Sequence, residues 1–328
     1  MTRVGQLRGP GLVLALILGV RAVGASPTTC PDVGEAALGL HAGRDDSIDQ
    51  YEAFGAWLGR DVEYRVVFCD PTKWEGIAAP WFLGTTMTWL ESRPARIEVI
   101  SLPLVPESER GRFAAVVAGE YDAHYAAFAR AMERRGIAHR VIVRLGWEGN
   151  GDWYPWSFQR DPGGFRAAFR RVVATMRAVA PRLRFEWCVS CRAPRRGGAH
   201  WTDGYPGDDV VDLVSMDVYD QWAPDWTAIV EGDAGLREFR AFALKHGKLE
   251  AYPEWGCSFD MKSQGGGDNP RFVEAMAAWI AARPGGVLYH AYWNTSAGGP
   301  RGVLHGRGAG RAPAAAAAYH RLFRAPGP

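Results

Sequence analysis

The sequence predicts a single-domain α/β protein with the (β/α)8 TIM barrel fold. From about residue 38, short apolar runs alternate with longer amphipathic segments, and eight such runs can be counted. No composition break or Pro/Ser-rich linker divides this part of the chain. Strict alternation of strand and helix indicates a parallel sheet. Eight repeats favour closure of that sheet into a barrel of about 250 residues.

The predicted strands are the eight short apolar runs. They cover residues 38–42, 62–69, 96–102, 140–145, 183–189, 211–218, 248–254 and 286–293. The amphipathic segments between and after them predict helices over residues 121–135, 162–180, 236–246, 270–282 and 314–323. Residues 297–310 are rich in glycine, and because a further helical segment follows them, we expect a loop after the eighth strand rather than a linker.

Start and stop signals support the helix predictions. Asp161 and Pro162 precede a segment in which Phe165 and Phe169 begin an apolar stripe at helical spacing, and Pro181 follows the end of that segment. An Asp followed by Pro is typical of the first turn of a helix, and a later Pro is typical of the stop.

The first 25 residues are predicted to be a secretory signal peptide. Arg3 and Arg8 form a basic region, residues 11–20 an apolar one, and residues 23–25 are small, as expected before a cleavage point. The apolar run is shorter than the ~20 residues that a bilayer span needs, and no later run reaches that length, so we expect no membrane association. The mature domain would comprise residues 26–328 and be secreted, to the periplasm or the extracellular space.

Export would favour disulfides between the cysteines. These are Cys30, Cys69, Cys188, Cys191 and Cys257, so one thiol would be left over. The spacing of Cys188 and Cys191 is also found in redox pairs and zinc sites, but an oxidising compartment favours a structural bridge. The connectivity stays open.

Composition limits the partners. The 38 basic and 36 acidic residues give a net charge of +2, and no basic block alternates with aromatic residues, which argues against nucleic-acid binding. His200, His290 and His305 do not form a metal-ligand spacing, so we predict no metal and no cofactor. We expect a monomer with a neutral ligand.

Two predicted strands lead into a glutamate beside aromatic residues. Glu148 follows the fourth strand in the segment VIVRLGWEGNGDWYPWSF, residues 141–158, and Glu254 ends the seventh in KLEAYPEWG, residues 248–256. In TIM barrels the chemistry lies at the carboxyl ends of the strands. Two carboxyl groups about 5–5.5 Å apart are what retaining glycoside hydrolysis needs, so these glutamates are the candidate catalytic pair.

The fourth-strand segment resembles the acid/base segment of glycoside hydrolase family 26, clan A retaining (β/α)8 hydrolases best known as endo-β-1,4-mannanases. The matching residues are Arg144, Glu148, Asn150, Gly151, Trp153, Tyr154 and Trp156. Residues 205–212 and the following Asp217-Val218-Tyr219 resemble the family's sixth-strand region. Residues 253–256, Pro-Glu-Trp-Gly, resemble its nucleophile segment.

The resemblance implies roles for four of these residues. Glu148 would be the general acid/base and Glu254 the nucleophile of a secreted endo-β-glycosidase acting on β-1,4-mannan. Arg144 and Tyr219 would position the nucleophile, although Arg144 could instead form a structural ion pair at the barrel rim. Trp147 and Trp153 would desolvate Glu148 and raise its pKa.

One residue departs from the family pattern. Family mannanases usually place His directly before the acid/base, whereas Trp147 occupies that position here. This departure leaves open a retaining hydrolase of another β-glycan, such as mixed-linkage β-glucan or xylan, and a non-catalytic glycan-binding barrel. Glu250 shares alternation parity with Glu254 and could also face inward, as a paired carboxylate lower in the barrel.

Further candidates for substrate contact lie near strand ends. They are Trp153, Trp156, Trp222, Trp226, Trp255, Trp293, Asp217 and His41, with Asn150 and Tyr154 in a supporting role. Indole rings stack on the C–H faces of sugars and can donate a hydrogen bond at a wet cleft edge. Three other tryptophans, Trp57, Trp187 and Trp279, are predicted to be packing residues.

Overall fold

The structure is a computed structural model that describes residues 1, 36–43, 47–194, 198–221, 225–260, 262, 264–283, 286–297, 299 and 301–325. The chain divides into two units, Met1–Pro31 and Asp32–Pro328. All described helices and strands belong to the second unit. The predicted signal peptide, apart from Met1, and Cys30 lie outside the described residues.

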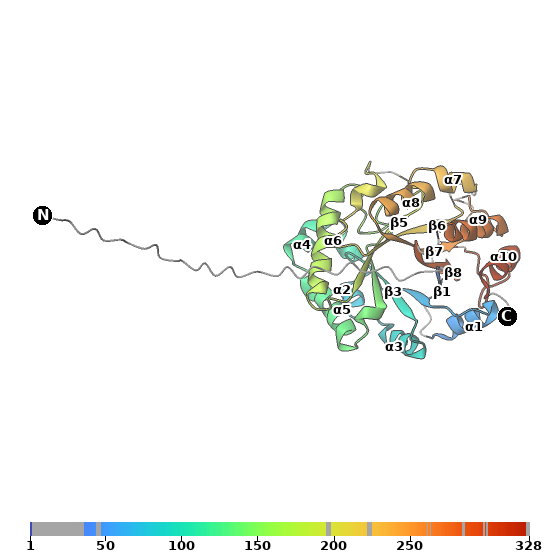
Figure 1. The fold of residues 1–328 in the computed structure, drawn as a ribbon, viewed down its shortest axis with the longest axis horizontal. Coiled ribbons are helices and arrows are strands. Elements are labelled where there is room, and N and C mark those ends of the chain that lie inside the picture. Colours follow the sequence, from blue (N-terminus) through green and yellow to red (C-terminus); the bar gives the residue numbers. More distant parts are fainter. Residues whose placement is uncertain are drawn as a thin grey trace. The chain divides into compact units, whose positions relative to one another are not determined.

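Eight parallel strands close into a barrel in chain order, and β8 pairs with β1 (Figure 1). The strands are β1 (Ala37–His41), β2 (Tyr64–Phe68), β3 (Ile97–Leu102), β4 (Val141–Leu145), β5 (Arg184–Ser190), β6 (Leu213–Tyr219), β7 (Leu249–Gly256) and β8 (Val287–Trp293). The predicted (β/α)8 barrel is confirmed, and each predicted strand corresponds to an observed one.

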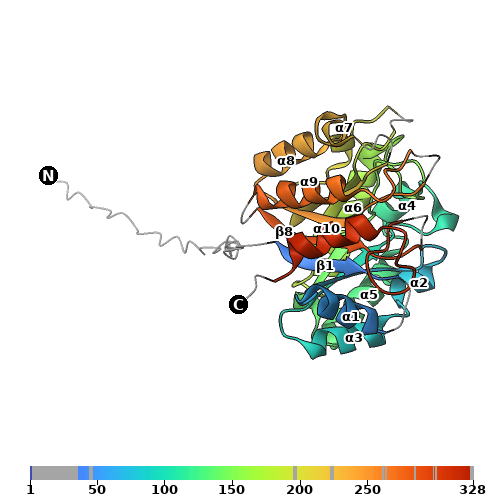
Figure 2. The same ribbon diagram turned by 90° about the vertical axis from the view of Figure 1, so that its right-hand side faces the viewer.

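Helices surround the barrel on its outside (Figures 1 and 2). They are α1 (Asp49–Leu58), α2 (Trp74–Ala78), α3 (Leu83–Ser92), α4 (Phe113–Ala118), α5 (Asp122–Arg134), α6 (Pro162–Arg177), α7 (Trp226–Glu231), α8 (Leu236–Lys245), α9 (Pro270–Ala281) and α10 (Pro313–Phe323). Short 3-10 turns cover Glu107–Glu109, Ala138–Arg140 and Trp201–Gly204. The five predicted helices are confirmed as α5, α6, α8, α9 and α10.

Helix α6 begins as its sequence predicts. The Asp161 carboxylate accepts a hydrogen bond from the Gly164 amide at 2.8 Å, and Pro162 occupies the first turn. Such a cap satisfies an amide that has no partner within the helix. The apolar stripe that includes Phe165 and Phe169 is buried against the barrel.

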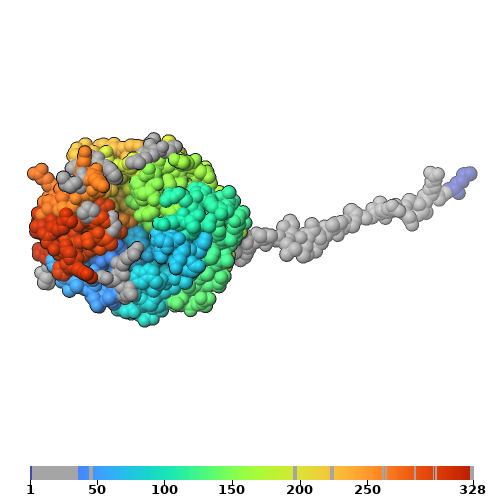
Figure 3. Space-filling model, turned by 180° about the vertical axis from the view of Figure 1, so that it is seen from behind, coloured from blue at the N-terminus to red at the C-terminus, as the bar shows by residue number. Residues whose placement is uncertain are grey.

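The first and last helices close the outer ring. The space-filling view shows the blue N-terminal segments beside the red C-terminal ones (Figure 3). His320 of α10 lies with Nε2 3.0 Å from the carbonyl oxygen of Trp57 in α1. Among the described residues, no helix has the length and apolar character needed to cross a membrane.

The cysteine prediction is wrong for the four described cysteines, each of which is a buried free thiol. Cys188 faces the inside of the barrel, where the Arg144 guanidinium lies 3.3 Å from its sulfur. The Cys191 sulfur instead lies 3.9 Å from the carbonyl oxygen of Ile229 in α7. Because side chains alternate along an extended chain, positions three residues apart point to opposite faces, and the two sulfurs cannot meet.

The expectation that Glu250 faces inward is also wrong. Its carboxylate lies between β7 and the helices, where it pairs with Arg240 of α8 at 3.1 Å and with Arg283 after α9. The Tyr252 hydroxyl donates to it at 2.8 Å. Glu250 is therefore a paired structural carboxylate, as expected, but outside the barrel rather than low within it.

Candidate active site

Glu148 lies in a tight turn directly after β4. Gly146 has a φ of 57° and Glu148 a φ of 51°, so both adopt the left-handed region. This conformation suits glycine but costs a residue with a side chain about 1–2 kcal/mol. The Gly151 amide donates to the Glu148 carbonyl at 2.9 Å and stabilises the turn. Strain of this kind is concentrated at functional positions.

Asn150 attaches this turn to the end of β5. Its amide group donates to the Ser190 carbonyl at 2.8 Å, and its side-chain oxygen accepts from the Ser190 amide at 2.7 Å. Gln159 donates to the Asn150 carbonyl at 2.7 Å. The structure therefore assigns Asn150 a supporting position beneath the turn.

Glu254 faces the barrel interior, where both of its carboxylate oxygens have partners. Arg144 Nη1 donates to Oε1 at 2.7 Å, and the Tyr219 hydroxyl donates to Oε2 at 3.0 Å. Charge-assisted hydrogen bonds are stronger than neutral ones, so Arg144 and Tyr219 together fix the orientation of this carboxylate.

Arg144 lies inside the barrel rather than at its rim. It is fully buried, and its second amino group contacts Asp217 and the Cys188 sulfur. Glu186, missed in the sequence, lies 3.8 Å from Arg144 Nε.

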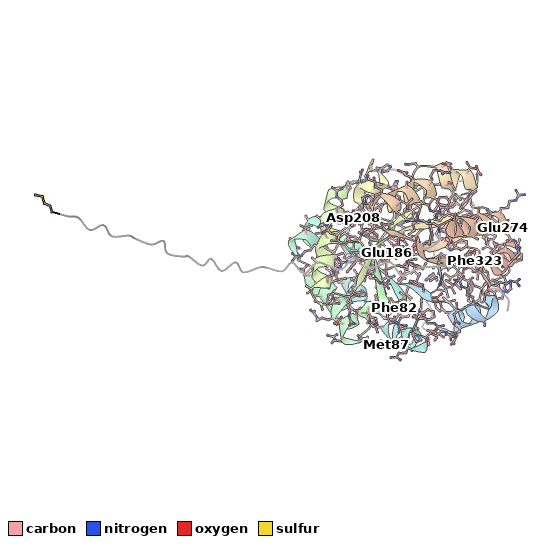
Figure 4. The ribbon with its side chains drawn as sticks, in the orientation of Figure 1. Phe82, Met87, Glu186, Asp208, Glu274 and Phe323 are labelled. Atoms are coloured by element: carbon pink, nitrogen blue, oxygen red, sulfur yellow. The ribbon has the colours of Figure 1, made fainter. Side chains whose placement is uncertain are left out.

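Glu186 lies among the strands (Figure 4). It is buried, and Ser215 and Tyr289 are its neighbours. The Ser215 hydroxyl donates to it at 2.5 Å and the Tyr289 hydroxyl at 2.7 Å. Burial raises its pKa above the ordinary value for a glutamate. A charged residue inside the apolar run 183–189 is the signal that could have found it.

An irregularity in β7 turns Glu254 inward. Ala251 belongs to the cluster inside the barrel, and Tyr252 faces outward to Trp279 of α9. Regular alternation would then send residue 254 outward. The pairing of β7 with β8 shifts register between Tyr252 and Trp255, and Glu254 points inward as a result.

Burial raises the pKa of Glu148 to about 7, and the negative charge of Glu254 adds to this effect. Arg144, the Ser190 side chain and Trp153 act in the opposite direction. The indole N–H of Trp153 donates to Glu148 Oε2 at 2.9 Å. Burial raises the pKa of Glu148 as predicted, but the N–H of Trp153 acts in the other direction because it favours the ionised carboxyl.

A cavity of about 560 Å³ is lined by Trp147, the residue before Glu148, whereas neither Glu148 nor Glu254 is among its lining residues. Its lining includes His41, Phe68, Trp147, Tyr154 and Trp293. Aromatic walls with a few polar groups are typical of ligand sites. The cavity thus brings together predicted site residues from the ends of β1, β4 and β8.

His41 packs its ring 4.1 Å from that of Trp293, and its Nδ1 lies 2.8 Å from the Val66 carbonyl oxygen. Burial lowers the pKa of His41 to about 4, so the ring is neutral at pH 7. A carbonyl oxygen only accepts, so Nδ1 carries the proton.

Several residues of the cavity wall were missed in the sequence, among them Trp81 and Phe82. Trp81, before α3, is 50% exposed and contributes to the lining, and Phe82 beside it is buried. The indole of Trp81 lies in a loop without periodicity, so only its residue type could have pointed to it.

Two tryptophans predicted to contact substrate are fully buried and cannot do so. Trp156 stacks on Tyr154 with ring centres 4.7 Å apart and donates to the Trp147 carbonyl at 2.7 Å. Trp255 packs behind β7 against Tyr319 of α10, at 5.6 Å between ring centres. Both predictions are corrected to core packing.

The other predicted tryptophans occupy different environments. Trp226 is half-buried and packs against Phe272, which makes it a packing residue instead of a cleft residue. Trp222 lies outside the described residues. The packing predictions for Trp57, Trp187 and Trp279 are confirmed by their contacts with the core.

A second set of side chains could hold a cation. His200, Asp233 and Glu238 come within reach of one another, and His200 Nε2 lies 3.1 Å from Glu238 Oε1. His200 directly precedes the turn Trp201–Gly204, Asp233 lies between α7 and α8, and Glu238 is in α8. None of the three lines the aromatic cavity.

Fold and site together define a (β/α)8 barrel with a two-carboxyl site at the ends of β4 and β7. Residues 104–238 match the model of Glycosyl hydrolase family 26. The chain is therefore related to this family, and the predicted resemblance is confirmed.

Two curated relatives match parts of the chain. Endoglucanase H of Acetivibrio thermocellus is 31% identical over 119 residues, which cover 33% of this chain and 13% of the relative. Mannan endo-1,4-beta-mannosidase of Bifidobacterium adolescentis is 27% identical over 199 residues, which cover 58% of this chain and 20% of the relative. The matched segments thus span a fifth or less of the length of these relatives.

Solved structures share the fold. The catalytic domain of the Bacillus sp. JAMB-750 GH26 endo-beta-1,4-mannanase superposes with a TM-score of 0.61 at 17% identity, covering 89% of this chain and 87% of that one. A modular endo-beta-1,4-mannanase from Cellulomonas fimi superposes with a TM-score of 0.62 at 18% identity, covering 88% and 71%. At these identities the likeness shows the barrel architecture alone.

Proposed function

We propose that this chain is a retaining endo-β-glycosidase that cleaves β-1,4-mannan by double displacement. The observation that carries the proposal is the carboxyl pair: Glu254, with both oxygens held by Arg144 and Tyr219, and Glu148, whose pKa is raised to about 7. An acid that keeps its proton near neutral pH beside a fixed carboxylate is what the first step of this reaction requires.

Each step has a defined bond change. A Glu254 oxygen attacks the anomeric carbon, while Glu148 gives its proton to the departing glycosidic oxygen, so that a glycosyl-enzyme ester and a shortened chain result. Glu148, now ionised, takes a proton from water, whose oxygen attacks the same carbon and releases Glu254. Arg144 and Tyr219 keep the nucleophile in place.

The choice of mannan rests on the relatives. The Bifidobacterium adolescentis relative and both structures named above carry mannanase or mannosidase in their names. A second candidate is β-glucan, favoured by the match to a relative named an endoglucanase. Trp147 lines the cavity at a position where family mannanases usually have His, and this departure leaves β-glucan and xylan open as substrates.

We also propose export and a monomeric state. The basic, apolar and small residues within positions 1–25 support a cleaved signal peptide. Amino-terminal sequencing of protein from the culture fluid or periplasm tests the first point, with a start near Ser26 expected. Light scattering tests the second, and a dimer mass would contradict it.

The reaction is tested by reducing-end release from β-1,4-mannan, galactomannan, mixed-linkage β-glucan, β-1,3-xylan and β-1,4-xylan. Glu254→Ala should lower the rate by several orders of magnitude on the polymer that wild type cleaves. Glu148→Ala should spare formation of the glycosyl-enzyme from aryl glycosides whose leaving group needs no proton. NMR of the first product should show retention, and product sizes report internal cleavage.

Glu231→Gln serves as the matched control, because Glu231 is a surface carboxylate paired with Arg237. It should keep wild-type activity. Full activity in Glu254→Ala would overturn the proposal. Folded wild type that binds one of these glycans without cleaving it would identify a glycan-binding barrel instead.

A further inference from the structure

Trp153 is partly exposed to solvent and also donates a hydrogen bond to Glu148. It is 39% exposed, five positions after Glu148, and its indole N–H donates to Glu148 Oε2 at 2.9 Å. A Cβ added to Gly151 would lie 2.4 Å from the indole ring, so the ring lies directly against this glycine. The glycine therefore lets Trp153 fold back over the turn and reach the carboxyl group.

We propose that Trp153 is a positioning residue for Glu148: its indole N–H holds one carboxyl oxygen and sets the pH range over which this group exchanges its proton. The inference rests on the proposed function for its catalytic meaning, since it concerns the acid/base of that reaction. The hydrogen bond itself is a property of the folded chain and can be measured without hydrolysis.

The indole N–H can only donate, so it selects among the states of the carboxyl group. A protonated oxygen is a poorer acceptor than its neighbour, so a bond to Oε2 directs the proton to Oε1. The same bond is stronger to the ionised group than to the neutral one. Trp153 thereby fixes which oxygen can deliver the proton and eases its loss.

The other groups around Glu148 act in both directions. Glu254 on β7 raises the pKa of Glu148, whereas Arg144 on β4 and Ser190 at the end of β5 lower it. Burial, the largest contribution, raises it. Without the indole N–H, the pKa of Glu148 rises and its protonated form is favoured. The protonated form serves the first step of double displacement. It hinders the second step, in which Glu148 must accept a proton.

The test is Trp153→Phe, which removes the N–H and keeps an aromatic ring. The carboxyl of Glu148 is followed by NMR in protein with carbon-13 at the glutamate side chain, and its signal is assigned by its absence in Glu148→Gln. We expect its pKa to rise by about half to one pH unit in the variant. The alkaline limb of kcat/KM on the polysaccharide should move upward by the same amount.

A second measurement separates this effect from general damage. kcat/KM for an aryl glycoside whose leaving group needs no proton should lose the alkaline limb in wild type and change less than threefold in Trp153→Phe. Trp156→Phe removes an indole N–H from the same loop, one that donates to the Trp147 carbonyl, and should leave the Glu148 titration unmoved.

An unchanged Glu148 titration in Trp153→Phe overturns the inference, and so does an equal shift in Trp156→Phe. These outcomes stand whether or not the protein cleaves polysaccharide. Absence of hydrolysis by wild type overturns the proposed function instead, while the titration still decides whether Trp153 controls the carboxyl.

Discussion

Because Glu148 is buried, we expect its carboxyl group to lower the free energy of unfolding of the barrel as the pH rises from acid to neutral. The pKa of this carboxyl is raised from 4.5 to about 7 in the folded protein. Between these values the folded state holds a proton that the unfolded state has released, so rising pH favours unfolding. The destabilisation that comes from ionising Glu148 is absent below pH 4.5 and complete above pH 7.

The magnitude follows from the two pKa values. One pH unit of difference corresponds to ~1.4 kcal/mol. Between pH 5 and pH 8 the Glu148 carboxyl should therefore lower the free energy of unfolding by about 2.5 kcal/mol. Glu148→Gln has no proton to exchange at this position. Its free energy of unfolding, relative to wild type, should rise by about this amount over the same interval.

The assay is urea unfolding of wild type and Glu148→Gln, followed by tryptophan fluorescence at several pH values from 5 to 8. Glu231→Gln is the control: Arg237 lowers the pKa of Glu231 at the surface, so the group is ionised in both states over most of this range. A difference between wild type and Glu148→Gln that stays constant from pH 5 to pH 8 would refute the reasoning.

Four further outcomes follow from the described contacts. Arg144→Lys keeps the charge but not the planar guanidinium that reaches both Glu254 and Asp217. Urea unfolding should therefore show a free energy of unfolding lower by about 2–3 kcal/mol, and kcat/KM should fall at least a hundredfold. Wild-type stability in this variant would contradict the role of the guanidinium. Glu148→Gly should unfold at higher temperature than Glu148→Ala, by about 1 kcal/mol in free energy, because the left-handed backbone suits glycine; the reverse order would exclude strain. Trp255→Ala should cost about 3–5 kcal/mol through a core cavity, whereas Trp293→Ala should cost less and mainly raise KM; equal costs would contradict their different burial. Dithiothreitol should leave the thermal midpoint unchanged, since the described thiols are free, and a clear drop would indicate a disulfide.

The barrel could be predicted because each element carries its own local signal. Helix α6 has its Asp161 cap, a proline in the first turn and an apolar stripe, and all three appear in the structure as the sequence predicts. The strands were recognisable as apolar runs between such helices. Signals of this kind depend on a few neighbouring residues, so they survive without knowledge of the tertiary packing.

The loop after β4 shows where this reasoning ends. Trp153 and Trp156 lie three residues apart in the same loop, yet one is exposed and donates to Glu148 and the other is fully buried. An irregular segment has no period, so its sequence does not assign a face to each side chain. The spacing of Cys188 and Cys191 was equally uninformative, because the direction of each sulfur depends on the strand that carries it.

Glu254 is the most instructive case, because alternation predicts the wrong side for it. Counting from Ala251 inside the barrel would put the Glu254 carboxylate among the helices and the Trp255 indole inside. The register shift of β7 reverses both, and Arg144 then supplies the cation that makes an inward carboxylate tolerable. Glu148 likewise depends on a departure from regular geometry, the positive φ after β4. The two candidate catalytic groups are thus directed by local irregularities that a period cannot reveal. The sequence pointed to them through their residue type and their places at the ends of two predicted strands, neither of which depends on strict alternation.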